Sequence, residues 1–182
     1  NSEYGTEYAD LNEIQRPLDR SNYRLFFDWC RFNQDVLRRF HEFERDIIHE
    51  YDPDLPVHAK VQSLAFSDRG VFEKGLNFEV MTGLGRISGN DAVQSYAPFE
   101  PGEYPQDWLT MAINYTLQRS VAPESPIFNS EDHVIQDRST HFIPGAHIRN
   151  SYWMQALYGQ GASTTWVWER FQGGDHAGNI LT

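Results

Sequence analysis

Two short segments of the sequence place reactive side chains where a strand would end. Residues 125–133 contain a short apolar run that leads to Glu131, a neighbouring aspartate and His133. Further along, residues 162–170 form a β-branched run that ends in tryptophans and charged residues. In an α/β barrel the catalytic groups lie at the C-terminal ends of the strands. A carboxylate at one strand end and aromatic side chains at the next therefore predict a site for a sugar.

Glu131 is the best candidate for a catalytic group. Glycoside hydrolysis needs two carboxyl groups across the scissile bond, one that protonates the leaving oxygen and one that attacks the sugar or activates water. The alternative is a solvated acid in the loop after a strand. Asn129, Ser130 and His133 favour the catalytic interpretation, because each can bind a carboxylate or a sugar hydroxyl.

Two pairs of polar or aromatic residues have the spacing of strand neighbours that share a face. Trp166 and Trp168 could pack in a core or stack on a pyranose, and we favour Trp168 near the mouth of the site with Trp166 deeper. His58 and Lys60 are either surface residues or line the interior. In the interior, Lys60 would need an acid or a ligand as its partner, because buried lysines are rarely unpaired.

Asn90 and Asp91 close a weaker strand-like segment, residues 84–91, and are further candidates for sugar hydroxyls. A turn after Gly89 would explain them as well. We expect no metal, because no histidine pair has the i, i+4 spacing of a His-Glu-x-x-His helix. The acid and histidine residues that would favour a metal are Asp132 with His133, His141 with His147, and Asp175 with His176.

The composition indicates one globular unit. The 182 residues are 40% hydrophobic and 14% aromatic, and no stretch of apolar residues is long enough for a membrane span. The net charge of −11 leaves no basic stripe for nucleic acid. Cys30, the single cysteine, lies within a helical pattern and is expected to be a half-buried helix residue rather than a nucleophile.

Helical and strand-like patterns alternate along the chain. The clearest helix spans residues 28–51, with an apolar residue every three or four positions, and ends before Asp52-Pro53. Such alternation implies parallel strands joined by right-handed crossovers. The other expected elements are strands at 56–62, 84–91, 126–131 and 163–168, helices at 108–117 and 145–159, and a short helix near residue 72.

With these residues assembled, the chain resembles the catalytic barrel of the β-galactosidase-like enzymes of glycoside hydrolase family 42, in the clan of (β/α)8 retaining glycosidases. The resemblance covers almost the whole chain. Residues 1–8 and 13–17 look like that family's "Leu-Asn-x-x-Trp-Gly-Thr" and "Glu-Ile-x-x-Pro", although Tyr4 replaces the usual tryptophan. Asp28-Trp29 and Phe32 match its "Asp-(Phe/Trp)-x-x-Phe" helix opening.

The resemblance implies an α/β fold, a partial (β/α)8 TIM barrel. A complete barrel typically needs about 250 residues, so residues 1–182 are expected to form a single domain holding strands five to eight, the C-terminal portion of the barrel. Glu131 then falls at the nucleophile position on the seventh strand. The acid/base glutamate is expected upstream of Asn1, because Glu13 lies in a polar segment that makes a poor strand.

The function expected from the resemblance is that of a retaining glycoside hydrolase that cleaves β-linked sugars, and this fragment alone should be inactive. The substrate would be a carbohydrate, with no cofactor, nucleic acid or membrane as a partner, and the full-length protein could form homo-oligomers. One alternative is a carbohydrate-binding or scaffold barrel without catalysis. The other is a metal-dependent hydrolase.

Overall fold

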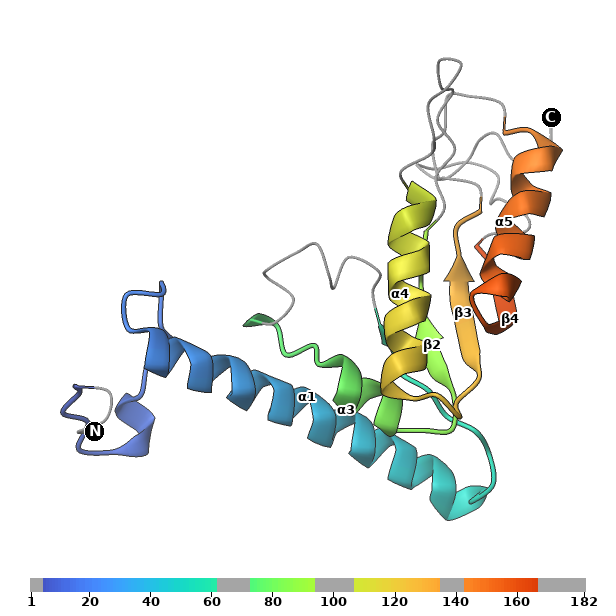
Figure 1. Ribbon diagram of the computed structural model, residues 1–182. Coiled ribbons are helices and arrows are strands. Elements are labelled where there is room, and N and C mark those ends of the chain that lie inside the picture. The colour runs from blue at the N-terminus through green and yellow to red at the C-terminus, as the bar shows by residue number, and fades with distance from the viewer. Residues whose placement is uncertain (1–4, 62–72, 94–106, 135–142, 167–182) are drawn as a thin grey trace, which may run out of the picture.

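The computed structural model describes residues 5–61, 73–93, 107–134 and 143–166, and within these ranges helices alternate with strands (Figure 1). A short 3-10 helix, η1, precedes the first long helix. The elements are η1 (Leu11–Glu13), α1 (Tyr23–Tyr51), β1 (Lys60–Val61), α3 (Phe78–Gly83), β2 (Ser88–Asn90), α4 (Asp107–Val121), β3 (Ile127–Asp132), α5 (Gly145–Leu157) and β4 (Gln160–Thr165).

The four strands form one parallel sheet in the order β1-β2-β3-β4. This confirms the parallel arrangement predicted from the alternating pattern. The predicted strand at 163–168 is misplaced, because β4 begins at Gln160 and its pairing ends at Thr165. The short helix expected near residue 72 lies outside the described residues, and α3 follows it at Phe78.

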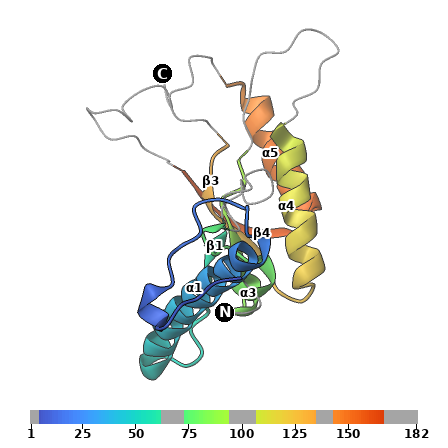
Figure 2. The ribbon, with the colours of Figure 1, turned by 90° about the vertical axis from the view of Figure 1, so that its left-hand side faces the viewer.

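Helices α4 and α5 lie on the same side of the sheet (Figure 2). Between them and the strands is an apolar cluster of Ala92, Met111, Tyr115 and Ile127. A second cluster, formed by Val61, Met81 and Leu84, packs between β1 and α3 and receives Leu37 from α1. The helices therefore cover one face of the sheet, and the other face is left for the candidate site.

Helix α1 begins five residues before the predicted start and ends where it was predicted to end. Asn22 caps its N-terminus, since its side-chain oxygen accepts from the backbone N–H of Leu25 at 3.2 Å. The helix stops at Tyr51 because Asp52 precedes a proline and takes an extended conformation. None of the helices in the described ranges has the length and apolar character that crossing a membrane requires.

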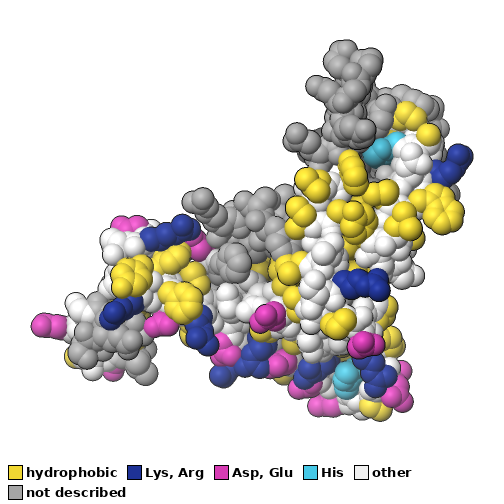
Figure 3. Space-filling model, in the orientation of Figure 1, with side chains coloured by type: hydrophobic (Ala, Val, Ile, Leu, Met, Phe, Trp, Pro, Cys, Tyr) yellow, Lys and Arg dark blue, Asp and Glu magenta, His cyan; other side chains and the backbone are white. Residues whose placement is uncertain are grey.

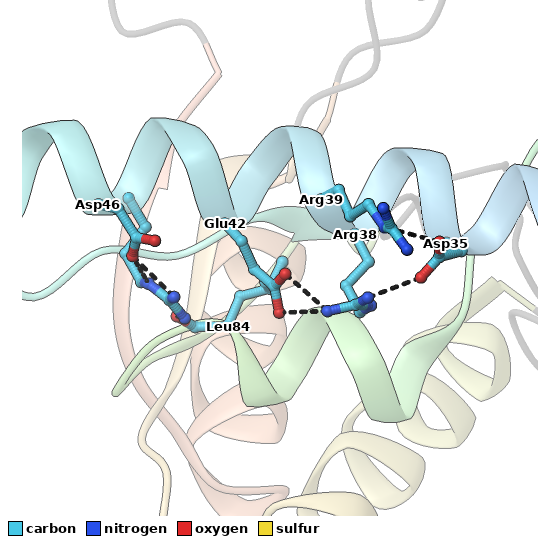
Figure 4. Close-up of polar contacts among 7 residues, drawn as sticks. Asp35, Arg38, Arg39, Glu42, Asp46 and Leu84 are labelled. Carbon is cyan, nitrogen blue, oxygen red and sulfur yellow. Dashed lines mark hydrogen bonds and ion pairs between the residues drawn. The ribbon is translucent and has the colours of Figure 1, made fainter.

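Polar contacts accompany Leu37 on the face of α1 that meets α3. Arg38 bridges Asp35 at 2.6 Å and Glu42 at 2.6 Å, and Arg45 donates to the carbonyl of Leu84 at 3.3 Å (Figure 4). Nearer the N-terminus, Asn77 Nδ2 donates to the side chain of a glutamine of α1. The ion pairs of Arg38 lie within α1, so α1 is held against α3 by the hydrogen bonds of Arg45 and Asn77 together with the apolar contact of Leu37.

The apolar stripe that predicted α1 is largely exposed. Its members include Phe32, Phe40 and Phe43, which are 56%, 54% and 62% exposed. Figure 1 shows the N-terminal half of α1 extending away from the sheet. Figure 3 shows further hydrophobic side chains on the surface over α4 and α5, where Leu109 and Trp153 are exposed. The periodicity identified the helix correctly, but the stripe does not face the sheet.

Candidate active site

The end of β3 contains a bulge that changes the direction of its side chains. Asn129 pairs with Ser163 and Asp132 with Thr165, so the step of three residues on β3 lies opposite a step of two on β4. Asn129 and Asp132 are both fully buried. In a regular strand, residues three apart point to opposite faces. The extra residue lets both face the helices and turns Glu131 to the other side.

The side chain of Asn129 closes the first part of this bulge. Its oxygen accepts from the backbone N–H of Glu131 at 3.2 Å, the local hydrogen bond typical of an Asx turn. Its amide nitrogen donates to the carbonyl of Ala92 at 2.9 Å and to the hydroxyl of Tyr115 at 3.3 Å. Asn129 therefore fixes the backbone of Glu131 against both β2 and α4.

The carboxylate of Glu131 has a basic partner on each oxygen. Oε2 accepts from the ammonium of Lys60, and Oε1 lies 3.1 Å from Nε2 of His133. Lys60 Nζ is also 4.0 Å from a carboxylate oxygen of Asp91. The acid that Lys60 was expected to need in the interior is thus present. The ammonium of Lys60, from β1, therefore lies between the acid that follows β2 and the acid near the end of β3.

Trp166 lies beside this group, at the turn after β4. Its ring centroid is 5.8 Å from that of His133, and its backbone N–H donates to the carbonyl of Asp132 at 2.9 Å. The side chain is 40% exposed. Trp166 comes just after the last paired residue of β4, Thr165, rather than inside the strand predicted at 163–168, and its depth relative to Trp168 stays a prediction. Trp168 lies outside the described residues.

His58 precedes β1 and packs edge-on against Phe128, with ring centroids 5.0 Å apart. Its imidazole also lies directly against the α-carbon of Gly89, where a side chain would collide with it. Burial lowers the pKa of His58 below its ordinary value of 6.5, so the ring is neutral at pH 7. Its Nδ1 is buried and has no hydrogen-bond partner in the part of the chain that is described.

Asn90 faces away from these residues, contrary to its prediction as a sugar ligand. It is fully buried, donates to Oε1 of Gln118 at 2.9 Å and accepts from the backbone N–H of Ala92 at 2.8 Å. Gln118 in turn donates to the carbonyl of Gly89 at 3.0 Å. Both functional ends of the Asn90 amide are used, so this side chain anchors β2 to α4.

Asp132 is held in the same way on the next strand. Its two oxygens accept from Nε2 of Gln155 at 2.8 Å and from the hydroxyl of Ser163 at 3.0 Å. Burial raises the pKa of Asp132 above its ordinary value, and the hydrogen bonds from Gln155 and Ser163 oppose that shift. A carboxyl group behind the sheet thus links β3 to both α5 and β4.

Comparison with known proteins assigns the family. A family model described as β-galactosidase, of glycoside hydrolase family 42, matches residues 1–175. The chain belongs to glycoside hydrolase family 42. No curated protein matches.

Solved structures support the family 42 assignment. An exo-carrageenase of family 42 from Bacteroides ovatus matches with a TM-score of 0.72 and 25% identity over 92% of this chain. A polyextremophilic β-galactosidase from the Antarctic haloarchaeon Halorubrum lacusprofundi shares the fold, with a TM-score of 0.69 and 19% identity over 94% of the chain. The chain spans about a quarter of each, 25% and 27% of their lengths.

Within this family 42 chain, five of the residues predicted from the strand ends are linked by the contacts above: Lys60, Asp91, Glu131, His133 and Trp166. His58 contacts Phe128 and Gly89 instead, Asn90 is buried on the opposite face, and Trp168 lies outside the described residues. Sequence reasoning missed the anchoring role of Asp132 and the contact of Phe128. The sequence carried no signal for Asp132, because its burial depends on the bulge after Asn129 that the structure reveals.

The metal hypothesis gains no support from the residues that can be placed. Among the described ranges, no three or more His, Cys, Asp or Glu side chains are grouped so that they could hold an ion. His133 and Asp132 point to opposite faces of β3, which separates that predicted pair. Of the other two pairs, His141, Asp175 and His176 lie outside the described residues.

Proposed function

We propose that this protein is a retaining glycoside hydrolase that cleaves β-linked sugars, with β-galactosides as the first class to test, and that Glu131 is its nucleophile. The observation that carries the proposal is the position of Glu131. Its carboxylate projects from a bulge at the C-terminal end of a parallel strand, between Lys60 and His133 and near Trp166. Membership in family 42 supports the reaction class.

In this mechanism Glu131 attacks the anomeric carbon as the bond to the leaving oxygen breaks, and a covalent glycosyl-enzyme forms. The contacts of Lys60 and His133 hold the carboxylate in one orientation before attack. A second carboxyl group, about 5 Å away in retaining enzymes, protonates the leaving group and later activates water. The resemblance assigns that role to a glutamate upstream of Asn1.

Glu13 is a poor candidate for the second carboxyl group in the described structure. Its carboxylate accepts from the backbone N–H of Ala9 at 2.9 Å, within its own short helical turn. That turn lies near the N-terminal end of α1, away from the sheet (Figure 1). The proposal therefore assigns the acid/base role to a residue outside residues 1–182.

The proposed sugar-binding residues are those on the same face as Glu131. Trp166 offers an exposed indole for stacking on a pyranose ring, and His58, Lys60, Asp91 and His133 offer polar groups for its hydroxyls. Trp168 remains a proposal from sequence alone. Asn90 is omitted, because its amide is buried and bonded to Gln118 and Ala92.

We further propose that the four parallel strands are strands five to eight of a (β/α)8 barrel. Two features support this assignment. The helices cover only one face of the sheet, as in a barrel wall. Asp91, Glu131, His133 and Trp166 lie at or just after the C-terminal ends of β2, β3 and β4, where barrel active sites are built. On this assignment β3 is strand seven and carries the nucleophile.

The proposal is tested in the full-length protein with aryl β-galactosides and other aryl β-glycosides. Glu131→Gln should abolish turnover, while Glu124→Gln, at the exposed opposite end of β3, should leave it unchanged. In Glu131→Ala, azide should restore turnover and give a glycosyl azide of inverted configuration, because a small anion can take the place of the missing nucleophile.

Normal turnover by Glu131→Gln would refute the nucleophile assignment. Sugar binding by a wild-type protein that shows no turnover would favour the non-catalytic carbohydrate-binding alternative. Loss of wild-type turnover on treatment with a chelator would instead support the metal-dependent hydrolase. Proton NMR of the released sugar distinguishes retention from inversion at the anomeric carbon.

A further inference from the structure

The direction of the Glu131 side chain depends on groups that lie behind it. Ser130 and Glu131 are the two residues between Asn129 and Asp132, and the latter pair is fully buried on the helix side of the sheet. If Asp132 left its site, β3 could regain the regular period of two. Glu131 would then be displaced from the face that carries Lys60 and His133.

Asp132 has hydrogen bonds to three separate places in the fold. Gln155 binds it from α5 at 2.8 Å, and Ser163 binds it from β4 at 3.0 Å. Its own backbone carbonyl accepts from the N–H of Trp166 at 2.9 Å. The same residue therefore determines where β3 ends and where the turn that carries Trp166 begins.

Polar groups supply the directional contacts at the end of β3. Asn129, Asp132 and Gln155 are all at 0% exposure, beside the buried apolar side chain of Val134. Apolar contacts tolerate small sliding movements, whereas hydrogen bonds are directional and unsatisfied buried groups are costly. The hydrogen bonds of Asn129 and Asp132 therefore favour the bulged conformation of β3 over a regular one.

We propose that Asp132 is a positioning residue, which acts through its bonds to Gln155 and Ser163 to hold the Glu131 carboxylate on the sugar-binding face. This inference rests on the proposed function. It assigns Asp132 no contact with substrate. It predicts that the orientation of Glu131 depends on the hydrogen bonds made by the side chain at position 132 and not on the negative charge of that side chain.

Two substitutions of Asp132 in the full-length protein separate shape from charge. Asn keeps an oxygen for Gln155, and its amide can donate to the hydroxyl of Ser163, which can also accept. Leu removes both bonds. Ser151→Ala is the matched control, because Ser151 is a buried polar residue one turn earlier in α5 whose hydroxyl lies 3.4 Å from His147 of the same helix.

The readout is kcat and KM per active site, with sites counted by covalent labelling of Glu131 with an activated 2-deoxy-2-fluoro-β-glycoside. A displacement of about 1 Å can cost 10²-fold in rate. We therefore expect Asp132→Leu to lower kcat and the labelling rate by about 10²-fold, with a smaller change in KM. Asp132→Asn should recover both to within about fivefold, and Ser151→Ala should match the wild type.

Normalisation to labelled sites removes losses that are due only to unfolding, because an unfolded molecule is not counted. If Asp132→Leu does not fold, Gln155→Met and Ser163→Ala each remove one of the two bonds and should each lower the labelling rate. Wild-type rates in every folded variant would overturn the inference. Equal loss in the Asn and Leu variants would also overturn it, since charge would then be the requirement.

The two proposals fail in distinguishable ways. If the wild type is never labelled at Glu131, the nucleophile assignment is wrong and the positioning role falls with it. If the wild type is labelled and Asp132→Leu is labelled at the same rate, only the positioning role is wrong. Peptide mapping of the labelled protein identifies the modified residue in each case.

Discussion

Replacing Gly89 by alanine tests whether His58 lies against β2 as the structure shows. A β-carbon at position 89 would lie 3.0 Å from Cε1 of His58 and closer still to Nδ1, and 2.9 Å from the carbonyl oxygen of Ala59. Ordinary contacts of a β-carbon begin at 3.4 Å. The imidazole would have to withdraw most at Nδ1, its nearest atom, and the carbonyl oxygen of Ala59 would have to shift by 0.5 Å to reach that distance.

The expected cost follows from two opposing effects. Overpacking of this kind typically costs about 1–3 kcal/mol. Replacing a glycine by alanine at a compatible backbone conformation restores about 0.4–1 kcal/mol through the entropy of the unfolded chain. Gly89 is not among the described glycines with positive φ, so this gain applies. The clash is larger, and we expect Gly89→Ala to lower the free energy of unfolding by about 1–2 kcal/mol.

The assay is a double-mutant cycle by urea denaturation, followed by tryptophan fluorescence. In the background of His58→Ala the cost of Gly89→Ala should fall by about 1 kcal/mol, because residues in contact show interaction energies of this size. Rescue should be partial, since the contact with the carbonyl of Ala59 remains. Gly83→Ala is the matched control, because nothing lies within 4 Å of its added β-carbon.

Two results would refute this reasoning. One is a Gly89→Ala protein as stable as the wild type, and the other is an equal cost in the presence and absence of the His58 imidazole. Either would mean that His58 does not occupy the space above Gly89. Under the proposed function, the displaced imidazole should also raise KM for an aryl β-glycoside, which Gly83→Ala should not do.

Three further predictions follow from particular contacts. Lys60→Met removes one partner of Glu131 and, because the lysine is partly solvated, should lower kcat/KM by about tenfold; unchanged kinetics would contradict the pairing. The pKa of Asp132 is raised above 3.8 in the folded protein, so folding favours its neutral form and the wild type should lose stability relative to Asp132→Asn as pH rises from 3.8 through the native pKa. The measurement is the difference in melting temperature between the two proteins across this pH range. A difference that does not change with pH would contradict the raised pKa. Residues 1–182 alone should self-associate through exposed apolar side chains, and Phe40→Glu with Phe43→Gln should shift sedimentation toward the monomer; an unchanged profile would contradict this.

The order of the elements could be predicted because each pattern was long enough to show its period. The 29-residue helix α1 repeats its apolar positions over many turns. Residues 125–131 placed an acid at the end of an apolar run, and β3 was found there. Where a segment is both periodic and bounded by proline or a cap residue, local chemistry alone defines it.

The faces of the short strands could not be predicted in the same way. β2 has three residues, Ser88–Asn90, all buried, so no alternation shows which side Asn90 takes. The bulge in β3 breaks the period of two between Asn129 and Asp132, so the period does not show to which face Glu131 points. For α1 the apolar period predicted the helix correctly. It did not predict which element packs against the apolar stripe, because periodicity shows that a stripe exists and not what covers it.

The start and the end of β3 are buried by different kinds of contact. Near the start of the strand, Ile127 is buried in an apolar cluster, whereas near its end Asn129 and Asp132 are buried among hydrogen bonds. The apolar part can stabilise the sheet without fixing the rotation of each side chain. Under the proposed function, catalysis requires that rotation to be fixed, because reacting atoms must be placed within fractions of an ångström. The hydrogen bonds of Asn129 and Asp132 offset the desolvation cost of burying these polar groups, and on this proposal they also fix the direction of the Glu131 carboxylate.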